Sequence, residues 1–218
     1  MITDYEHLSI GKYLSVLELA KEQDNDLAIV SALSGHTEDE LLNMPITEYR
    51  TLADKASFLF TQPVPAKVAK TYKVGDFSLH LEHKPQRLTT AQYIDFKEYA
   101  KAGETDIWKY LSVVLVPEGK TYNDGYDVAE VADAIRDHLP TPEALGIRDF
   151  FVMRLGRLIA DSLTYSQRLT RKMKDKDKAR MMQTRIAELQ GFLTSGAGCE
   201  MWTMLAKSPA ALGVKYMR

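Results

Sequence analysis

A change in the spacing of apolar residues within residues 71–102 constrains the fold more than any other feature of this sequence. In the stretch TYKVGDFSLHLE, apolar and polar side chains alternate on both sides of Gly75-Asp76. Such alternation around a glycine-containing turn is typical of a β-hairpin, because glycine readily takes the positive φ that tight hairpin turns need. After the hairpin, the apolar residues of the stretch 90–101 have helical spacing. We therefore expect a hairpin over residues 71–82 and a helix over residues 90–101.

The alternation also predicts which side chains of the hairpin are buried. Phe77, Leu79 and Leu81 share one face of the second strand, while Ser78 and His80 lie on the other, since successive side chains of a strand point in opposite directions. We expect the apolar face to pack against helices and the polar face to meet solvent.

Outside the hairpin, the sequence has the apolar spacing and the capping residues of helices. The first sixty residues predict four short helices, the last of which, over residues 48–60, presents an apolar stripe that includes Phe60. A helix that contains Leu115 is expected to end before Pro117, and a long apolar helix is expected over residues 147–165. The residues expected to cap helices are Ser9, Thr37 (in a capping box with Glu40), Asp127 and Thr141. The predicted fold class is mainly α, a helical protein with one small β-hairpin.

Two prolines mark a boundary in the chain. Pro63 and Pro65 restrict themselves and the residues before them to extended conformations, so they form a stiff connector. We expect an N-terminal helical unit at residues 1–62, a hairpin plus helical unit at residues 66–165, and a basic helical C-terminal extension at residues 166–218.

The sequence contains no constellation typical of an enzyme, a cofactor site or a metal site. His80 and His83 are the only histidines near one another, and on a strand they would point to opposite faces, which is wrong for a shared metal ion. Cys199 has no neighbouring histidine to activate it. The loop over residues 121–127, TYNDGYD, lacks the spacing of a calcium-binding loop. We expect no catalytic, cofactor-binding or metal-binding residues, and a protein that is not an enzyme.

Charge is distributed unevenly, although the formal net charge is only −2. Residues 1–60 carry 11 acidic and 4 basic side chains, which sum to −7, and residues 154–218 carry 5 acidic and 13 basic ones, which sum to +8. Such asymmetry is typical of a basic interaction surface, or of two ends that attract each other within an assembly.

The basic residues of the C-terminal third form a candidate basic surface. Its members are Arg168, Arg171, Lys172, Lys174, Lys176, Lys178, Arg180 and Arg185. Clustered Lys and Arg could contact the phosphates of a nucleic acid, but Asp175 and Asp177 interrupt the run and no aromatic residues interleave with it. A solvated helix face or a helix–helix junction is therefore the favoured interpretation, and nucleic-acid binding is the alternative. Beyond the run, Ile186, Leu189 and Phe192 resume an apolar face.

Large aromatic side chains indicate a surface that binds protein. Aromatic residues and methionine are enriched at the buried centres of interfaces, and this chain has more of them than a hairpin and short helices need for their own cores. The candidate partner-binding residues are Tyr93, Phe96, Tyr99 and Trp108. We expect either self-association or the capture of a partner's helical segment in a groove.

Several stretches resemble proteins from the tail-gene region of tailed bacteriophages. They are DYEHLSIGKYLSVLELAK, LAIVSALSGHTEDELLNMPITEYRTLADKASFL, YKVGDFSLHLE with LTTAQYIDFKEY, and VVLVPEGKTYNDGYDVAEVADAIRDHL. Over roughly residues 5–165 the chain is similar to phage tail assembly chaperones and baseplate-assembly chaperones. The shared motifs are structural rather than catalytic.

The resemblance implies a role in virion assembly. The chain would bind another phage structural protein, such as the tape measure protein or a tail component, and keep it soluble in the host cytoplasm. No apolar run approaches the roughly 20 residues that a membrane-spanning helix needs, so we expect no membrane partner. The alternatives are a structural component of the virion at a head–tail or tail junction, and a nucleic-acid-binding protein that uses residues 168–185.

Overall fold

The computed structural model describes residues 1–21, 25–83, 87–101, 107–172 and 184. In chain order its elements are α1 (Ile10–Leu19), α2 (Asp26–Ser34), α3 (Glu38–Leu42), α4 (Ile46–Ala56), the 3-10 helix η1 (Ser57–Phe60), β1 (Thr71–Val74), β2 (Phe77–Leu81), α5 (Thr90–Lys101), α6 (Ile107–Val114), β3 (Leu115–Pro117), α7 (Val128–His138) and α8 (Thr141–Lys172). The protein is mainly helical and has one small antiparallel sheet, which confirms the predicted fold class.

The predicted hairpin forms strands β1 and β2. Tyr72 pairs with Leu79 and Val74 pairs with Phe77 in an antiparallel register. Between the strands Gly75 has a φ of 56°, in the left-handed region. Since glycine has no Cβ, it adopts this conformation without steric cost, and the turn forms where the sequence predicted it.

The two faces of β2 are as different as the sequence predicted. Leu79 and Leu81 are fully buried, and Phe77 is half-buried on the same face. Ser78 and His80 are exposed on the opposite face. The prediction of which β2 side chains are buried is therefore confirmed.

A third strand, β3, was not predicted. Helix α6 ends at Val114, and the chain continues directly into β3, where Leu115 pairs with Leu81 and Pro117 pairs with Leu79. The expectation that Leu115 belongs to the helix was therefore wrong. A short apolar run fits a buried helix and a strand equally well. Here the strand is stabilised by backbone hydrogen bonds to the free edge of β2. Proline is tolerated on such an edge strand.

One large apolar core lies between the sheet and helices α6, α7 and α8; we call it the sheet core. Its buried members are Ile10, Tyr72, Val74, Leu79, Leu81, Ile107, Leu111, Val114, Leu115, Val131, Ile135, Leu139, Ala144, Leu145, Ile147 and Phe151. Among these buried members Ile10 comes from α1, and Tyr13 and Leu14 of α1, which are partly buried, also pack against this core.

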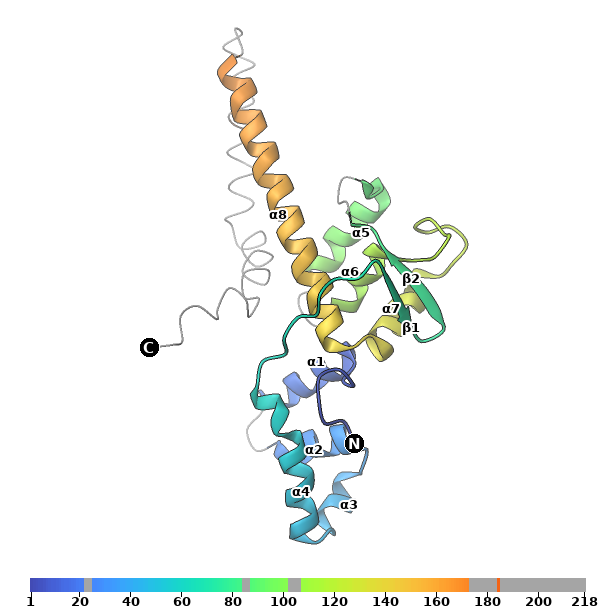
Figure 1. The fold of residues 1–218 in the computed structure, drawn as a ribbon, viewed down its shortest axis with the longest axis vertical. Coiled ribbons are helices and arrows are strands. Elements are labelled where there is room, and N and C mark those ends of the chain that lie inside the picture. The colour runs from blue at the N-terminus through green and yellow to red at the C-terminus, as the bar shows by residue number, and fades with distance from the viewer. Residues whose placement is uncertain (22–24, 84–86, 102–106, 173–183, 185–218) are drawn as a thin grey trace.

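A second, smaller core lies among α1, α2 and α4; we call it the N-terminal core, and the helices α1 to η1 the N-terminal unit. Its buried members are Leu8, Val16, Leu33 and Ala56. In Figure 1 this unit forms one end of the molecule, and α8 leads away from it towards the other end. Helix α1 contributes to both cores and so connects the two regions.

Backbone hydrogen bonds also join the N-terminal unit to the start of α8. The Ile10 amide donates to the Leu139 carbonyl at 3.0 Å, and the Thr141 amide donates to the Leu8 carbonyl at 2.8 Å. The Thr141 hydroxyl donates to the same Leu8 carbonyl at 2.7 Å. The prediction that Thr141 caps α8 was therefore wrong: Thr141 is the first residue of α8 and its side chain stabilises the junction instead.

The other predicted caps are confirmed. The Ser9 hydroxyl accepts from the amide of Lys12 at the start of α1. Thr37 and Glu40 form a complete capping box on α3. The Asp127 carboxylate accepts from an amide in the first turn of α7 at 2.8 Å. Each of these residues satisfies amides that a helix N-terminus otherwise leaves without a partner.

Helix α8 is longer than predicted. It spans 32 residues, Thr141–Lys172, rather than residues 147–165. At a rise of 1.5 Å per residue its length is about 48 Å. It therefore includes the first residues of the predicted basic extension and carries them far from the N-terminal unit (Figure 1).

Candidate functional site

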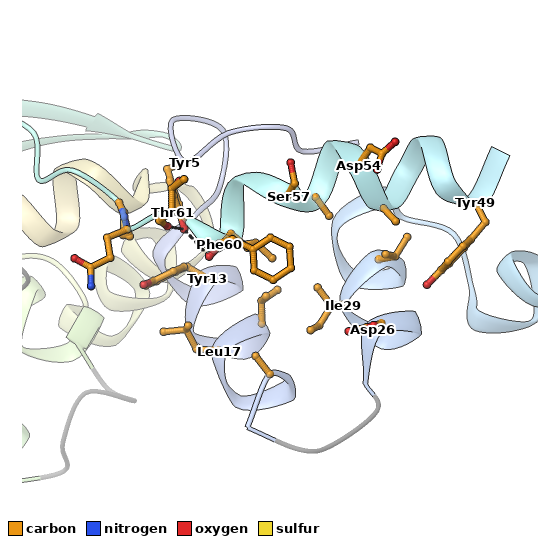
Figure 2. Close-up of a pocket in the computed structure, with 18 residues that line it drawn as sticks. Tyr5, Tyr13, Leu17, Asp26, Ile29, Tyr49, Asp54, Ser57, Phe60 and Thr61 are labelled. Atoms are coloured by element: carbon orange, nitrogen blue, oxygen red, sulfur yellow. Dashed lines mark hydrogen bonds between the residues drawn. The ribbon is translucent and has the colours of Figure 1, made fainter. Parts of the chain in front are cut away.

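The N-terminal unit carries an open groove of about 600 Å³, which we call the N-terminal groove. Figure 2 shows its labelled lining residues, among them Tyr13 and Leu17 of α1, Asp26 and Ile29 of α2, Tyr49 and Asp54 of α4, and Phe60 of η1. Most of the lining is apolar or aromatic. A pocket of this volume is within the range of sites that bind small molecules or several side chains of a partner.

The groove exists because the apolar stripes of its helices exceed what the N-terminal core covers. Helix α2 packs against both α1 and α4, and the groove opens between α1 and α4 (Figure 2). Ala56 is the only buried residue of α4, whereas Tyr49 and Ala53 are half-buried on the side that faces the groove. An amphipathic helix is stabilised when its apolar stripe is covered. This face of α4 would therefore be stabilised by contact with a partner.

Phe60 stands at the rim of the groove with 94% of its surface exposed. The sequence predicted that Phe60 continues the apolar stripe of one helix over residues 48–60. The single helix was wrong, because α4 ends at Ala56 and the 3-10 helix η1 follows. Phe60 nevertheless continues the stripe, since it lines the groove together with Tyr49 and Ala53. A large exposed aromatic ring beside an apolar groove is a typical feature of a binding surface.

Tyr5 fixes the chain at one end of the groove. Its hydroxyl donates to the carbonyl of Thr61 at 2.5 Å. Its ring meets the rings of Phe58 and Tyr13 edge to face, with centroids 4.9 Å and 5.8 Å away. Burial raises the pKa of the Tyr5 phenol to about 12, and the neighbouring Tyr13 phenol adds to this shift. The segment that follows η1 is thereby held against α1.

The charged side chains in the described lining of the groove are both acidic. They are Asp26, in the first turn of α2, and Asp54 of α4, and both are exposed. The residues described in the lining include no lysine or arginine, and residues 1–60 have an excess of seven acidic side chains. The groove therefore favours a ligand that combines an apolar face with positive charge.

Neither of the predicted partner-binding residues whose side chains are described lies in this groove. Trp108 is half-buried and packs against the sheet core. Tyr99 is half-buried on α5. The side chains of Tyr93 and Phe96 lie outside the described residues, although the α5 backbone that carries them is described. A partner-binding role for these four residues stays a prediction.

The candidate basic surface is described only where it begins. The backbone of Arg168, Arg171 and Lys172 forms the last turns of α8, at the end remote from the N-terminal groove (Figure 1). The predicted basic residues that lie outside the described residues are Lys174, Lys176, Lys178, Arg180 and Arg185. The predicted basic surface therefore stays a prediction.

The part of the chain that the structure describes lacks two further features. No three or more His, Cys, Asp or Glu side chains in that part come together in a way that could bind a metal ion. None of its helices combines the length and the apolar composition needed to span a membrane.

The N-terminal groove was not predicted from the sequence. A signal for it was present in Phe58-Leu59-Phe60, three large apolar side chains in succession at the end of a helix. One helix face cannot bury three consecutive side chains, because they point about 100° apart. Such a run therefore leaves at least one large side chain uncovered.

Comparisons with known proteins leave the groove as the main basis for a functional proposal. No family model, curated protein or solved structure matches this chain.

Proposed function

We propose that the chain is a non-enzymatic assembly protein of a tailed bacteriophage, and that its N-terminal groove binds an apolar helical segment of another phage structural protein. The observation that carries this proposal is the apolar groove of about 600 Å³ with the exposed ring of Phe60 at its rim. Walls made of helices suit a helical ligand, since an amphipathic helix can lay its apolar face into a groove of this kind.

The phage assignment depends on the sequence resemblance over residues 5–165. Tail and baseplate-assembly chaperones keep a partner soluble by covering its apolar surface, and an exposed apolar groove provides such a cover. The partner would be the tape measure protein or another tail component, bound in the host cytoplasm before assembly. The open groove and the absence of a catalytic motif in the sequence both agree with this function.

A capture experiment with Phe60→Ser tests the proposal. The chain would be co-expressed with each tail protein encoded beside it, and the amount of soluble partner that co-purifies would be measured. We expect Phe60→Ser to reduce capture at least fivefold, because the substitution removes the largest apolar contact at the rim (1 kcal/mol is a factor of about 5).

Val64→Ser is the matched control for this experiment. Val64 is 80% exposed and lies in the connector a few residues beyond Phe60, outside the groove lining. We expect its variant to capture the partner as well as the parent protein does. Equal capture by Phe60→Ser and the parent protein, or failure to capture any tail protein, would refute the proposal.

Mass spectrometry of purified virions distinguishes a chaperone from a structural component. A chaperone leaves its partner during assembly, so we expect the chain to be absent from mature particles. Stoichiometric presence would favour the alternative, a virion component at a head–tail or tail junction.

Binding of nucleic acid by residues 168–185 is the second alternative, favoured by the eight basic residues in that run. Phosphate contacts release counterions, so the affinity would fall steeply with salt. We expect only weak binding that is lost near physiological salt. Submicromolar binding that remains at about 150 mM salt would favour this alternative.

A further inference from the structure

We propose that, in the absence of a phage partner, the N-terminal groove is occupied by residues 178–193 of a second copy of this chain. This inference concerns the same groove as the proposed function and goes beyond it. It holds whether or not a tail protein is the partner, because it concerns the purified chain alone.

Residues 178–193, KARMMQTRIAELQGFL, have the composition that the groove favours. Met182, Ile186, Leu189 and Leu193 are spaced i, i+4, i+7 and i+11, which is the spacing of one face of an amphipathic helix. Helix-in-groove partners present their anchoring side chains at this spacing.

The charges of this segment are complementary to those of the groove. Lys178, Arg180 and Arg185 outnumber the single acidic residue of the segment, which gives it a net charge of +2. The described groove lining offers Asp26 and Asp54 and no basic side chain. Attraction between the two is therefore expected, and it fixes which segment binds more than it adds affinity.

The segment cannot reach the groove of its own chain. Helix α8 starts at the N-terminal unit, where Thr141 hydrogen-bonds to Leu8, and leads away from it over about 48 Å (Figure 1). From Lys172 to residue 178 there are only six steps along the backbone, which span at most about 21 Å when fully extended. The groove must therefore take this segment from another copy.

An antiparallel pair of α8 helices brings each segment to the other copy's groove. In such a pair the end of one α8 lies beside the start of the other, and the contacts are reciprocal about a two-fold axis. Met153 and Tyr165 of α8 are 60% and 64% exposed, so α8 itself offers apolar surface that the pair would cover. The expected assembly is a closed dimer.

Light scattering of the purified full chain over a range of concentrations measures this dimer. We expect the double variant Asp26→Lys/Asp54→Lys to raise the dimer dissociation constant about tenfold or more, because two attractive contacts become repulsive. Glu48→Lys is the matched control: Glu48 is also an exposed acid in the first turn of a helix of this unit, but it does not line the groove. We expect it to dimerise like the parent chain.

A charge swap tests the contact directly. The variant Lys178→Glu/Arg180→Glu/Arg185→Glu reverses the sign of the segment's charge. By itself it should dimerise as weakly as the groove variant Asp26→Lys/Asp54→Lys. Mixed in equal amounts, the two variants should form heterodimers, because each groove again meets a segment of opposite charge. The segment variant leaves the N-terminal unit intact, so it tests the proposal even if the groove variant fails to fold.

Each outcome of these experiments decides the proposal. A parent chain that is monomeric at every concentration overturns it, whether the groove is empty or holds another segment of its own chain. Self-association that both variants leave unchanged overturns it in favour of another face. Variants that fail to recover dimers when mixed also overturn it. No phage partner is present, so these outcomes are independent of the capture experiment.

Discussion

The two cores of this protein differ in how completely its apolar residues are covered. Among the described residues, the sheet core contains 16 buried apolar residues, whereas the N-terminal core contains four. Burial of apolar surface is the main stabilising term in folding, so the N-terminal unit has little of its own to stabilise it. It presents instead an open apolar groove. A chain that leaves apolar side chains uncovered beside so small a core depends on the larger core for support.

The strongest test of this comparison introduces a charge into the sheet core. Leu79 is fully buried on the central strand β2. We expect Leu79→Asp to destabilise the protein by several kcal/mol, because an unpaired carboxylate would be buried, and both regions should unfold together. Chemical denaturation followed by circular dichroism measures this. The control is His80→Asp on the exposed face of β2, and a Leu79→Asp protein as stable as this control would contradict the described packing.

A cavity in the N-terminal core should have a local effect. Leu33 of α2 is 1% exposed, and Leu33→Ala is expected to cost about 3 kcal/mol. Because the core around Leu33 is small, we expect the amides of α2 and α4 to exchange hydrogen much faster while those of α6 and α7 stay protected. Equal acceleration in both regions would show that they unfold as one unit.

The connector between the regions provides a third test. Gly146 of α8 is approached so closely by the backbone of Ala66 that an added Cβ would collide with the Ala66 carbonyl. We expect Gly146→Ala to cost about 2 kcal/mol, since backbone cannot give way as a flexible side chain can. In an unobstructed helix the same change would stabilise by about 1 kcal/mol. A rise in melting temperature would therefore contradict this contact.

Removing the Tyr5 hydroxyl tests how η1 is held in place. We expect Tyr5→Phe to cost about 1 kcal/mol, through loss of the hydrogen bond to the Thr61 carbonyl. The folded pKa of about 12 is above the ordinary value of 10. Between these values the unfolded state loses the proton and the folded state keeps it, so stability falls as pH rises from 10 to 12.

That loss of stability should be smaller in Tyr5→Phe, as measured by denaturation at a series of pH values. The ultraviolet difference between the parent and the variant should show one tyrosine that titrates near pH 12. Titration of this tyrosine at its ordinary value of 10 would contradict its burial.

The smallest effect on stability is expected at the rim of the groove. Phe60 is 94% exposed, so Phe60→Ser should change the free energy of unfolding by no more than about 0.5 kcal/mol. Thermal melting measures this. The stability of Phe60→Ser should stay nearly unchanged while its capture of a partner falls at least fivefold. A large destabilisation would mean that Phe60 belongs to a core and not to a binding surface.

The hairpin and the caps could be predicted because their signals are local. Gly75 between alternating residues determines a turn, and Thr37 with Glu40 determines a helix start within four residues of chain. The strand at Leu115 and the role of Thr141 could not be predicted in this way, because each depends on a partner distant in sequence. Leu115 pairs with Leu81, and Thr141 hydrogen-bonds to Leu8.

The groove shows the same limit of local signals. The apolar residues of α1, α2 and α4 were recognised from their spacing, but spacing does not tell whether a stripe is covered by its own chain. Phe60 lies on the same groove as the stripe of α4, yet 94% of its surface is exposed. The candidate partner-binding residue Trp108 is half-buried and packs on the sheet core, and its role in partner binding stays a prediction.

The hydrogen bonds between Leu8 and Thr141 have a consequence for the order in which a ribosome can complete this fold. The two residues are separated by 133 positions. At about 5–20 residues per second, roughly 7 to 27 seconds of translation pass between them. Until Thr141 has been made, the Leu8 carbonyl lacks this hydrogen-bond donor, and the sheet core into which Ile10 packs is incomplete. The beginning of the nascent chain therefore emerges early and reaches its final place only after two thirds of the protein has been made.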